Sequence, residues 1–148
     1  MSAYKRLLVA IDLSAAADVV MKTAVELGRA LQAQLHVIHV HKIHAGKLVE
    51  GGMADVGALV SQEVAELELQ LERFAAQYAA AGITITLGVY SGEPYFEIIQ
   101  AAGKAGADMI VMGTHGRTGI AHLVLGSVAE NVLRHAQVPV VCIRCHRQ

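Results

Sequence analysis

Four short apolar runs alternate along the chain with longer segments whose apolar residues recur every three or four positions. The runs are Leu7–Ile11, Leu35–Val40, Met109–Met112 and Val138–Ile143. Their length and their β-branched residues are typical of strands that are covered on both faces, as in a parallel sheet. A chain that alternates such strands with amphipathic segments is expected to fold in the α/β class.

A fifth strand is expected where Ile83, Ile85, Leu87 and Val89 alternate with Thr, Gly and Tyr residues. This period of two predicts an edge strand with one solvated face. Two doubly wound sheet orders fit five strands, and 3-2-1-4-5 is favoured over 2-1-3-4-5 because it places the third strand at an edge. We therefore expect a five-stranded parallel sheet with helices on both faces, in one domain over residues 1–148.

Four helices are expected between the strands. The third begins at Pro94, and the fourth begins at Ser127, where Ser127-x-x-Glu130 has the form of a capping box. Segment 42–59 contains four glycines and no clean period, which predicts a long functional loop after the second strand. The predicted apolar faces are Val20, Ala24, Leu27 and Leu31 in the first helix, Val64, Leu67, Leu71, Phe74 and Tyr78 in the second, and Phe96, Ile99 and Ala102 in the third.

The overall charge argues against several classes of partner. A formal net charge of −1 gives no basic field for nucleic-acid binding. After Lys5 and Arg6 only five apolar residues precede Asp12, too few for a signal peptide or a membrane span. Two cysteines are consistent with a reducing compartment, so a cytoplasmic protein is expected.

Polar residues and glycines converge on one predicted crevice. In the order 3-2-1-4-5 the chain direction reverses between strands one and four, and ligands bind there beyond the carboxyl ends of the strands. Asp12 follows the first strand, and Gly113 follows the fourth. Glycines 113, 116, 119 and 126 let a ligand approach the backbone, and the helix starting near Ser127 offers free N–H groups. With the guanidinium of Arg117, these features predict a cradle for a di- or triphosphate.

The better-known phosphate loops are absent, since neither G-x-x-x-x-G-K-[ST] nor a G-x-G-x-x-G after the first strand occurs. Instead, Gly113-x-x-Gly116, nine residues and Gly126-Ser127 match the G-x2-G-x9-G-[S/T] signature of the universal stress proteins that bind ATP. The chain resembles that family along its whole length, from LVAIDLS at 8–14 through His39–Val40 to the closing VPVVCIR. The resemblance implies the 3-2-1-4-5 sheet and a role in stress response or regulation.

The resemblance also implies roles for individual residues. Asp12 would contact the ribose or a magnesium-linked group, Val40 would read the adenine edge with its main chain, and Gly113 would lie by the ribose. Leu13 departs from the pattern, because many relatives have glycine there. The phosphates would be bound by Gly116, Gly126, Ser127 and Val128 through backbone amides and the Ser127 hydroxyl.

Other polar residues are given structural interpretations. Ser14 is expected to be the N-cap of the first helix. Cys142 and Cys145 lie in a C-x-x-C-H sequence, but residues i and i+3 of a strand point to opposite faces, which argues against a shared haem or metal site. His39 and His41 share a strand face without a carboxylate or cysteine at ligand spacing, so no metal site is assigned.

The leading hypothesis is an ATP-binding regulatory protein, with or without Mg²⁺ and with an unidentified protein partner. No catalytic residue is assigned, because no committed base or carboxylate pair is found. The alternatives are a slow adenine-nucleotide hydrolase and a dimer that binds no nucleotide. The last strand, Val138–Ile143, is apolar on both faces and lies at an edge, so it is expected to pair with a second copy in a homodimer.

Overall fold

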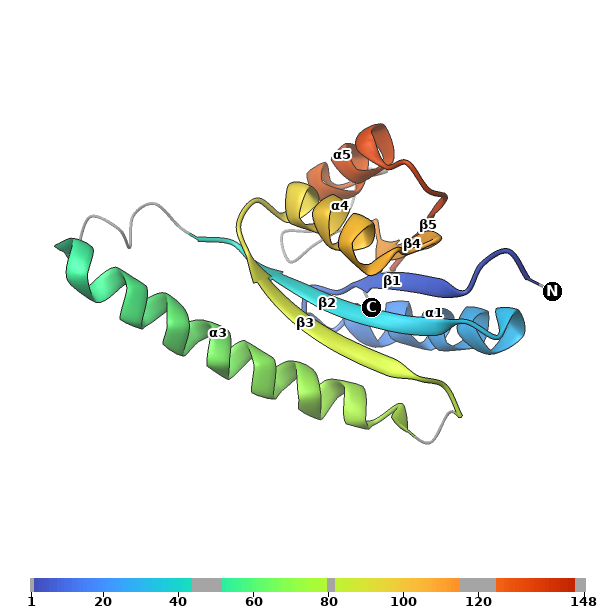
Figure 1. Cartoon of the computed structure of the whole chain (residues 1–148), viewed down its shortest axis with the longest axis horizontal. Helices are drawn as coiled ribbons and strands as arrows, with labels where there is room; N and C mark the ends of the chain where they lie inside the picture. The colour runs from blue at the N-terminus through green and yellow to red at the C-terminus, as the bar shows by residue number, and fades with distance from the viewer. Residues whose placement is uncertain (1, 44–51, 80–81, 115–124, 146–148) are drawn as a thin grey trace.

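The computed structural model describes residues 2–43, 52–79, 82–114 and 125–145, and in these ranges strands and helices alternate from end to end (Figure 1). The order is β1 (Arg6–Ala10), α1 (Ala17–Leu31), β2 (Gln34–His41), α3 (Gly52–Ala76), β3 (Ile85–Ser91), α4 (Pro94–Ala105), β4 (Met109–Gly113), α5 (Ser127–His135) and β5 (Val140–Ile143).

The five strands form one parallel sheet in the order β3-β2-β1-β4-β5. Ala10, the last residue of β1, pairs with Ile38 of β2 on one side and with Met112 of β4 on the other. The predicted 3-2-1-4-5 doubly wound sheet is therefore confirmed, and the point where the chain direction reverses lies between β1 and β4.

Two cores cover the two faces of this sheet. On one face, Leu7, Val9 and Val37 are buried under α1 and the C-terminal half of α3. On the other face, Leu8 and Ile38 are buried under α4 and α5. Figure 1 shows the same arrangement, with α1 and α3 on one side of the strands and α4 and α5 on the other.

The alternation in β3 has the predicted meaning. Ile85, Leu87 and Val89 pack against the core under α1 and α3, while Thr86 on the opposite face is exposed. Tyr90 folds back over Gly88, where a Cβ atom would lie 2.9 Å from the tyrosine ring. This ring covers part of the face that the sequence pattern left to solvent.

The second helix begins earlier than predicted. Segment 42–59 was expected to be a loop, but α3 starts at Gly52, so residues 52–59 are helical. The glycines suggested a break, whereas Met53, Ala54, Ala58 and Leu59 are good helix formers. Residues 42 and 43 follow the end of β2 outside any helix or strand, and residues 44–51 lie outside the described ranges.

One further detail of a helix and one of a strand differ from the prediction. The buried side of α4 is Ile98, Ala101 and Ala102, whereas Phe96 is 51% exposed. The apolar residues of this short helix are compatible with either of two adjacent helix faces, and only packing decides which face is buried. The last strand is also shorter than predicted, since β5 begins at Val140, after Pro139.

In the described ranges, no helix is both long and apolar enough to cross a membrane.

Candidate functional site

The carboxyl ends of β1 and β4 carry the two polar segments predicted to form the site. These strands are neighbours, and their paired residues end at Ala10 and Met112. Asp12 lies two residues past the end of β1, and Gly113 is the last residue of β4. The fold thus brings Asp12 and Gly113 to the same end of adjacent strands, at the position where open α/β sheets bind ligands.

Asp12 is held in a tight turn. Its Oδ1 accepts hydrogen bonds from the Ser14 amide at 3.0 Å and from the Ser14 hydroxyl at 2.6 Å. Leu13 between them has φ 59°, in the left-handed region that favours glycine. This backbone explains on physical grounds why glycine suits the position and why leucine there carries strain.

Ser14 does not cap α1 as predicted. The helix starts at Ala17 and its N-cap is Ala16, which has no side-chain capping bond. The Ser14 hydroxyl accepts a hydrogen bond from the Ala16 amide at 3.2 Å, and it donates to Asp12. Ser14 therefore stabilises the turn that carries the Asp12 carboxylate instead of the first turn of the helix.

Val40 lies past the end of β1 on the neighbouring strand. The β1–β2 ladder ends where the Ile11 amide donates to the Ile38 carbonyl at 3.0 Å. Alternate residues of a parallel strand direct their main-chain groups to the same neighbour, so those of Val40 point to the β1 side, beyond this last bond. Its side chain packs on the opposite side of the sheet from α1, in the core under α4 and α5.

The start of α5 lies beside the end of β4. The Gly126 amide donates to the Thr114 carbonyl at 2.6 Å, and the Thr114 amide donates to the Ile143 carbonyl at 3.0 Å. Gly126 is the N-cap, and Ser127 is the first helical residue, so the predicted capping box with Ser127 as N-cap is wrong. The Gly126 amide is engaged by Thr114, and the amides of Ser127 and Val128, in the first turn, have no acceptor within α5 itself.

Two predicted residues, Gly116 and Arg117, lie in segment 115–124, outside the described residues. Their roles stay predictions.

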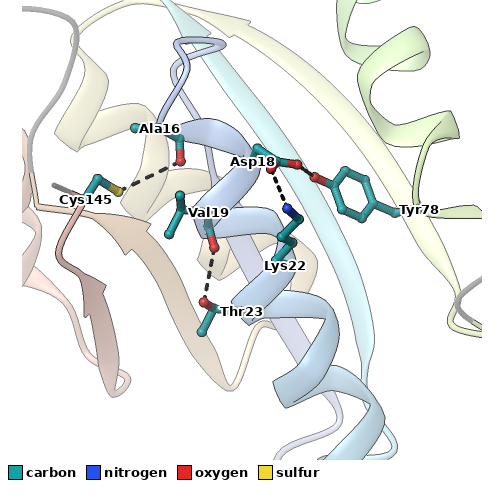
Figure 2. A network of polar contacts seen from close by, with 7 residues as sticks. All are labelled: Ala16, Asp18, Val19, Lys22, Thr23, Tyr78 and Cys145. Atoms are coloured by element: carbon teal, nitrogen blue, oxygen red, sulfur yellow. Dashed lines mark hydrogen bonds and ion pairs between the residues drawn. The ribbon is translucent and has the colours of Figure 1, made fainter. Parts of the chain in front are cut away.

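The two cysteines point to opposite faces of the sheet, as predicted. Cys142 packs in the core under α4 and α5, and Cys145 packs in the core under α1 and α3. The Cys145 thiol lies 3.9 Å from the Ala16 carbonyl oxygen (Figure 2). Burial, together with the nearby Asp12 carboxylate, raises the pKa of this thiol. Cys145 thus forms part of the wall beside the Asp12 turn, in its neutral form.

The first turn of α1 is also tied to Tyr78, just past the end of α3. Figure 2 shows Asp18 between Lys22 and Tyr78, where its carboxylate accepts the tyrosine hydroxyl and lies 2.8 Å from the Lys22 ammonium. The bonds from Lys22 and Tyr78 lower the pKa of Asp18. These contacts fix the helix that follows the Asp12 turn.

The histidines at the end of β2 are bound to protein groups. The His41 Nε2 lies 2.8 Å from Glu63 Oε2 of α3. His39 is 8% exposed, and its Nδ1 lies 2.9 Å from the Ile11 carbonyl oxygen. Over the described parts of the chain, no group of three or more His, Cys, Asp or Glu side chains is placed to hold a metal ion.

Sequence reasoning missed the contributions of His39, Thr114 and Cys145 to this region. His39 was weighed as a metal ligand, although a histidine between buried apolar strand residues is itself a signal of a specific buried hydrogen bond. Thr114 is 6% exposed. It lies within the glycine motif, where the glycines were the recognised signal and Thr114 was not singled out. The position of Cys145 beside Asp12 depends on tertiary structure and has no local sequence signal.

Comparison with known proteins identifies the family of this chain. A model of the Universal stress protein family matches residues 3–144. Universal stress protein MJ0531 of Methanocaldococcus jannaschii is 31% identical over 143 residues, which cover 95% of this chain and 82% of that protein. Universal stress protein A homolog 2 of Coxiella burnetii is 31% identical over 148 residues and covers 97% of each chain. The solved structure of MJ0577, also from Methanocaldococcus jannaschii, has a TM-score of 0.85 at 26% identity and covers 98% of this chain and 99% of that one. The chain belongs to the universal stress protein family.

Proposed function

We propose that this protein binds ATP between the ends of β1 and β4 and acts as a regulatory, stress-response protein of the cytoplasm. The observation that carries the proposal is the Gly126–Thr114 hydrogen bond of 2.6 Å, which holds the N-terminus of α5 at the end of β4. This bond sets the positive end of the α5 dipole and its first-turn amides beside the switch point of the sheet. An anionic phosphate chain is the ligand that such a terminus favours.

In this proposal, different residues contact the adenine, the ribose and the phosphates. The Val40 main chain meets the adenine edge, and Asp12 and Gly113 meet the ribose. The amides of Ser127 and Val128 bind phosphate oxygens. The Ser127 hydroxyl, Gly116 and Arg117 bind the phosphates as well. Where Mg²⁺ accompanies ATP, the Asp12 carboxylate supplies the hard oxygen ligand that this ion prefers.

Other members of the family support the choice of an adenine nucleotide. One solved structure with this fold is a universal stress protein in complex with cAMP, and another is the Archaeoglobus fulgidus universal stress protein in complex with dAMP. Both are 24% identical to this chain, so they support only that this fold accommodates an adenine nucleotide.

A regulatory role is preferred over catalysis because no residue of the proposed site is assigned as a general base. Ser14 engages the Asp12 carboxylate in two hydrogen bonds, which makes Asp12 a poor candidate for proton abstraction. A slow adenine-nucleotide hydrolase remains the alternative, and a regulatory protein partner is part of the proposal.

The test is to release nucleotide from the purified protein, identify it by mass spectrometry, and follow ADP formation over time. Bound ATP with turnover slower than about one per minute supports a sensor, since typical enzymes turn over near 10 per second. Fast turnover would favour the hydrolase. Absence of binding at millimolar ATP would overturn the proposal and favour a dimer that binds no nucleotide.

A glycine variant tests the position of the phosphates. Gly126 has φ −73° and ψ 163°, which valine adopts readily, so Gly126→Val is expected to fold while its side chain narrows the cradle. ATP affinity should fall at least tenfold. Gly103→Val, at an open position in α4 where a Cβ atom meets nothing within 4 Å, is the matched control and should bind normally. Normal binding by Gly126→Val would mean that the phosphates lie elsewhere.

A further inference from the structure

His39 is a polar side chain that follows two buried apolar ones on one face of β2. Leu35 and Val37, which precede it on the same face of β2, are 1% and 0% exposed, and His39 is 8% exposed. A buried imidazole is costly unless hydrogen bonds replace those that it made with water. The histidine is therefore expected to have a specific partner, and the Ile11 carbonyl oxygen lies 2.9 Å from its Nδ1.

This contact defines the state of the ring. A carbonyl oxygen only accepts hydrogen bonds, so the Nδ1 atom must carry the hydrogen. The Ile11 amide in turn donates to the Ile38 carbonyl. Two consecutive residues of β2, Ile38 and His39, therefore bind both main-chain groups of Ile11. Ile11 directly precedes Asp12, so the orientation of its peptide sets where the Asp12 turn begins.

The same contact affects Val40. In a parallel ladder that continued past β1, the Ile11 carbonyl would accept the Val40 amide. Among the described residues, the Val40 amide makes no backbone hydrogen bond to Ile11, and the imidazole is the donor to that oxygen. The imidazole thus occupies the carbonyl oxygen that the next hydrogen bond of the ladder would use.

We propose that His39 is a positioning residue for the nucleotide, whose Nδ1–H group holds Ile11 so that the Asp12 turn and the Val40 amide both face the ligand. This inference rests on the proposed function of the site. It adds a residue that touches no ligand yet acts on both ends of the nucleoside.

Two amide substitutions at His39 distinguish the effect of a donor at the place of Nδ1 from the effect of side-chain size and polarity. In His39→Asn the side-chain nitrogen can occupy the place of Nδ1, whereas in His39→Gln the amide reaches the place of Nε2. The Asn variant should bind ATP within about threefold of the native protein. The Gln variant and His39→Leu should bind roughly tenfold more weakly, because Ile11 is no longer held and the binding geometry of the Asp12 turn and the Val40 amide is populated less. His36→Gln, at the other end of β2, is the matched control and should bind normally.

A second readout does not depend on nucleotide. The Ser14 amide reports the Asp12 turn because it donates to Asp12 Oδ1 at 3.0 Å. Without ligand, its hydrogen exchange should be faster in the Gln and Leu variants than in the Asn variant and the native protein. Unfolding midpoints of all variants, measured in parallel, show whether any loss of affinity follows global stability.

The outcomes separate the two proposals. If the native protein does not bind ATP, the proposed function fails, and the Ser14 exchange rates still decide whether His39 positions the turn. If the native protein binds ATP and all three variants bind equally well, or if affinity follows only the unfolding midpoint, the role of His39 is overturned.

Discussion

At the turn after β1, three consecutive residues meet opposing requirements. Asp12 presents a carboxylate that the proposed function assigns to the nucleotide, Ser14 holds that carboxylate with two hydrogen bonds, and Leu13 between them takes φ 59°. A left-handed backbone costs a residue with a Cβ atom about 1 kcal/mol or more. The half-buried Leu13 side chain packs against the core under α1 and α3, and this burial offsets part of that cost.

Comparison of two truncations at Leu13 isolates the backbone strain. Leu13→Gly and Leu13→Ala both remove the packed side chain, but only alanine retains the unfavourable φ. The glycine variant should be more stable than the alanine variant by about 1 kcal/mol, which reverses the usual order of the two residues. Urea unfolding of both variants measures the difference. An alanine variant of equal or greater stability would show that the turn is not strained.

At the scale of elements, the sequence predicted what depends on periodicity and missed what depends on packing. The alternation in β3 was sufficient to place that strand at an edge, and so to choose the sheet order. The start of α3 was missed because glycine residues were interpreted as breaks, although a helix that continues past them loses only about 1 kcal/mol for each. The buried face of α4 and the N-cap of α5 depend on tertiary contacts. In the candidate site, the glycine motif indicated Gly113 and Ser127, but no pattern indicated that His39 contacts the residue before Asp12.

Gly57 provides a test of the corrected start of α3. It is exposed inside the helix, and an added Cβ atom would meet nothing within 4 Å. Gly57→Ala should therefore stabilise the protein by roughly 0.5–1 kcal/mol. Gly82 has equally open surroundings but φ +69°, so Gly82→Ala should be destabilising. Thermal unfolding of both variants gives the signs, and a neutral or destabilising Gly57→Ala would indicate that residues 52–59 are not helical in solution.

At the scale of the whole molecule, the sheet has two different edges. The β3 edge lies beside the long helix α3, with which β3 is in contact (Figure 1). The β5 edge is four residues long, and its residues bear apolar side chains on both faces. Pro139 and Ile143 direct their main-chain groups toward β4, so Val140 and Cys142 between them direct theirs outward. An apolar edge whose main-chain groups point outward favours pairing with another strand.

We predict that the protein is a homodimer in which segments Val138–Ile143 of two copies pair at this edge. Cys142→Pro removes an outward N–H group while it spares the bonds to the Pro139 and Ile143 carbonyls, so it should give a folded monomer. Val89→Pro is the matched control, because it places a proline at an outward-facing position of the opposite edge strand and should leave the dimer intact. Sedimentation equilibrium at micromolar concentrations measures the mass, and circular dichroism checks that both variants fold. A native protein that sediments as a monomer, or a Cys142→Pro variant that remains a dimer, would rule out pairing through β5, because a proline cannot donate the hydrogen bond that such a ladder requires.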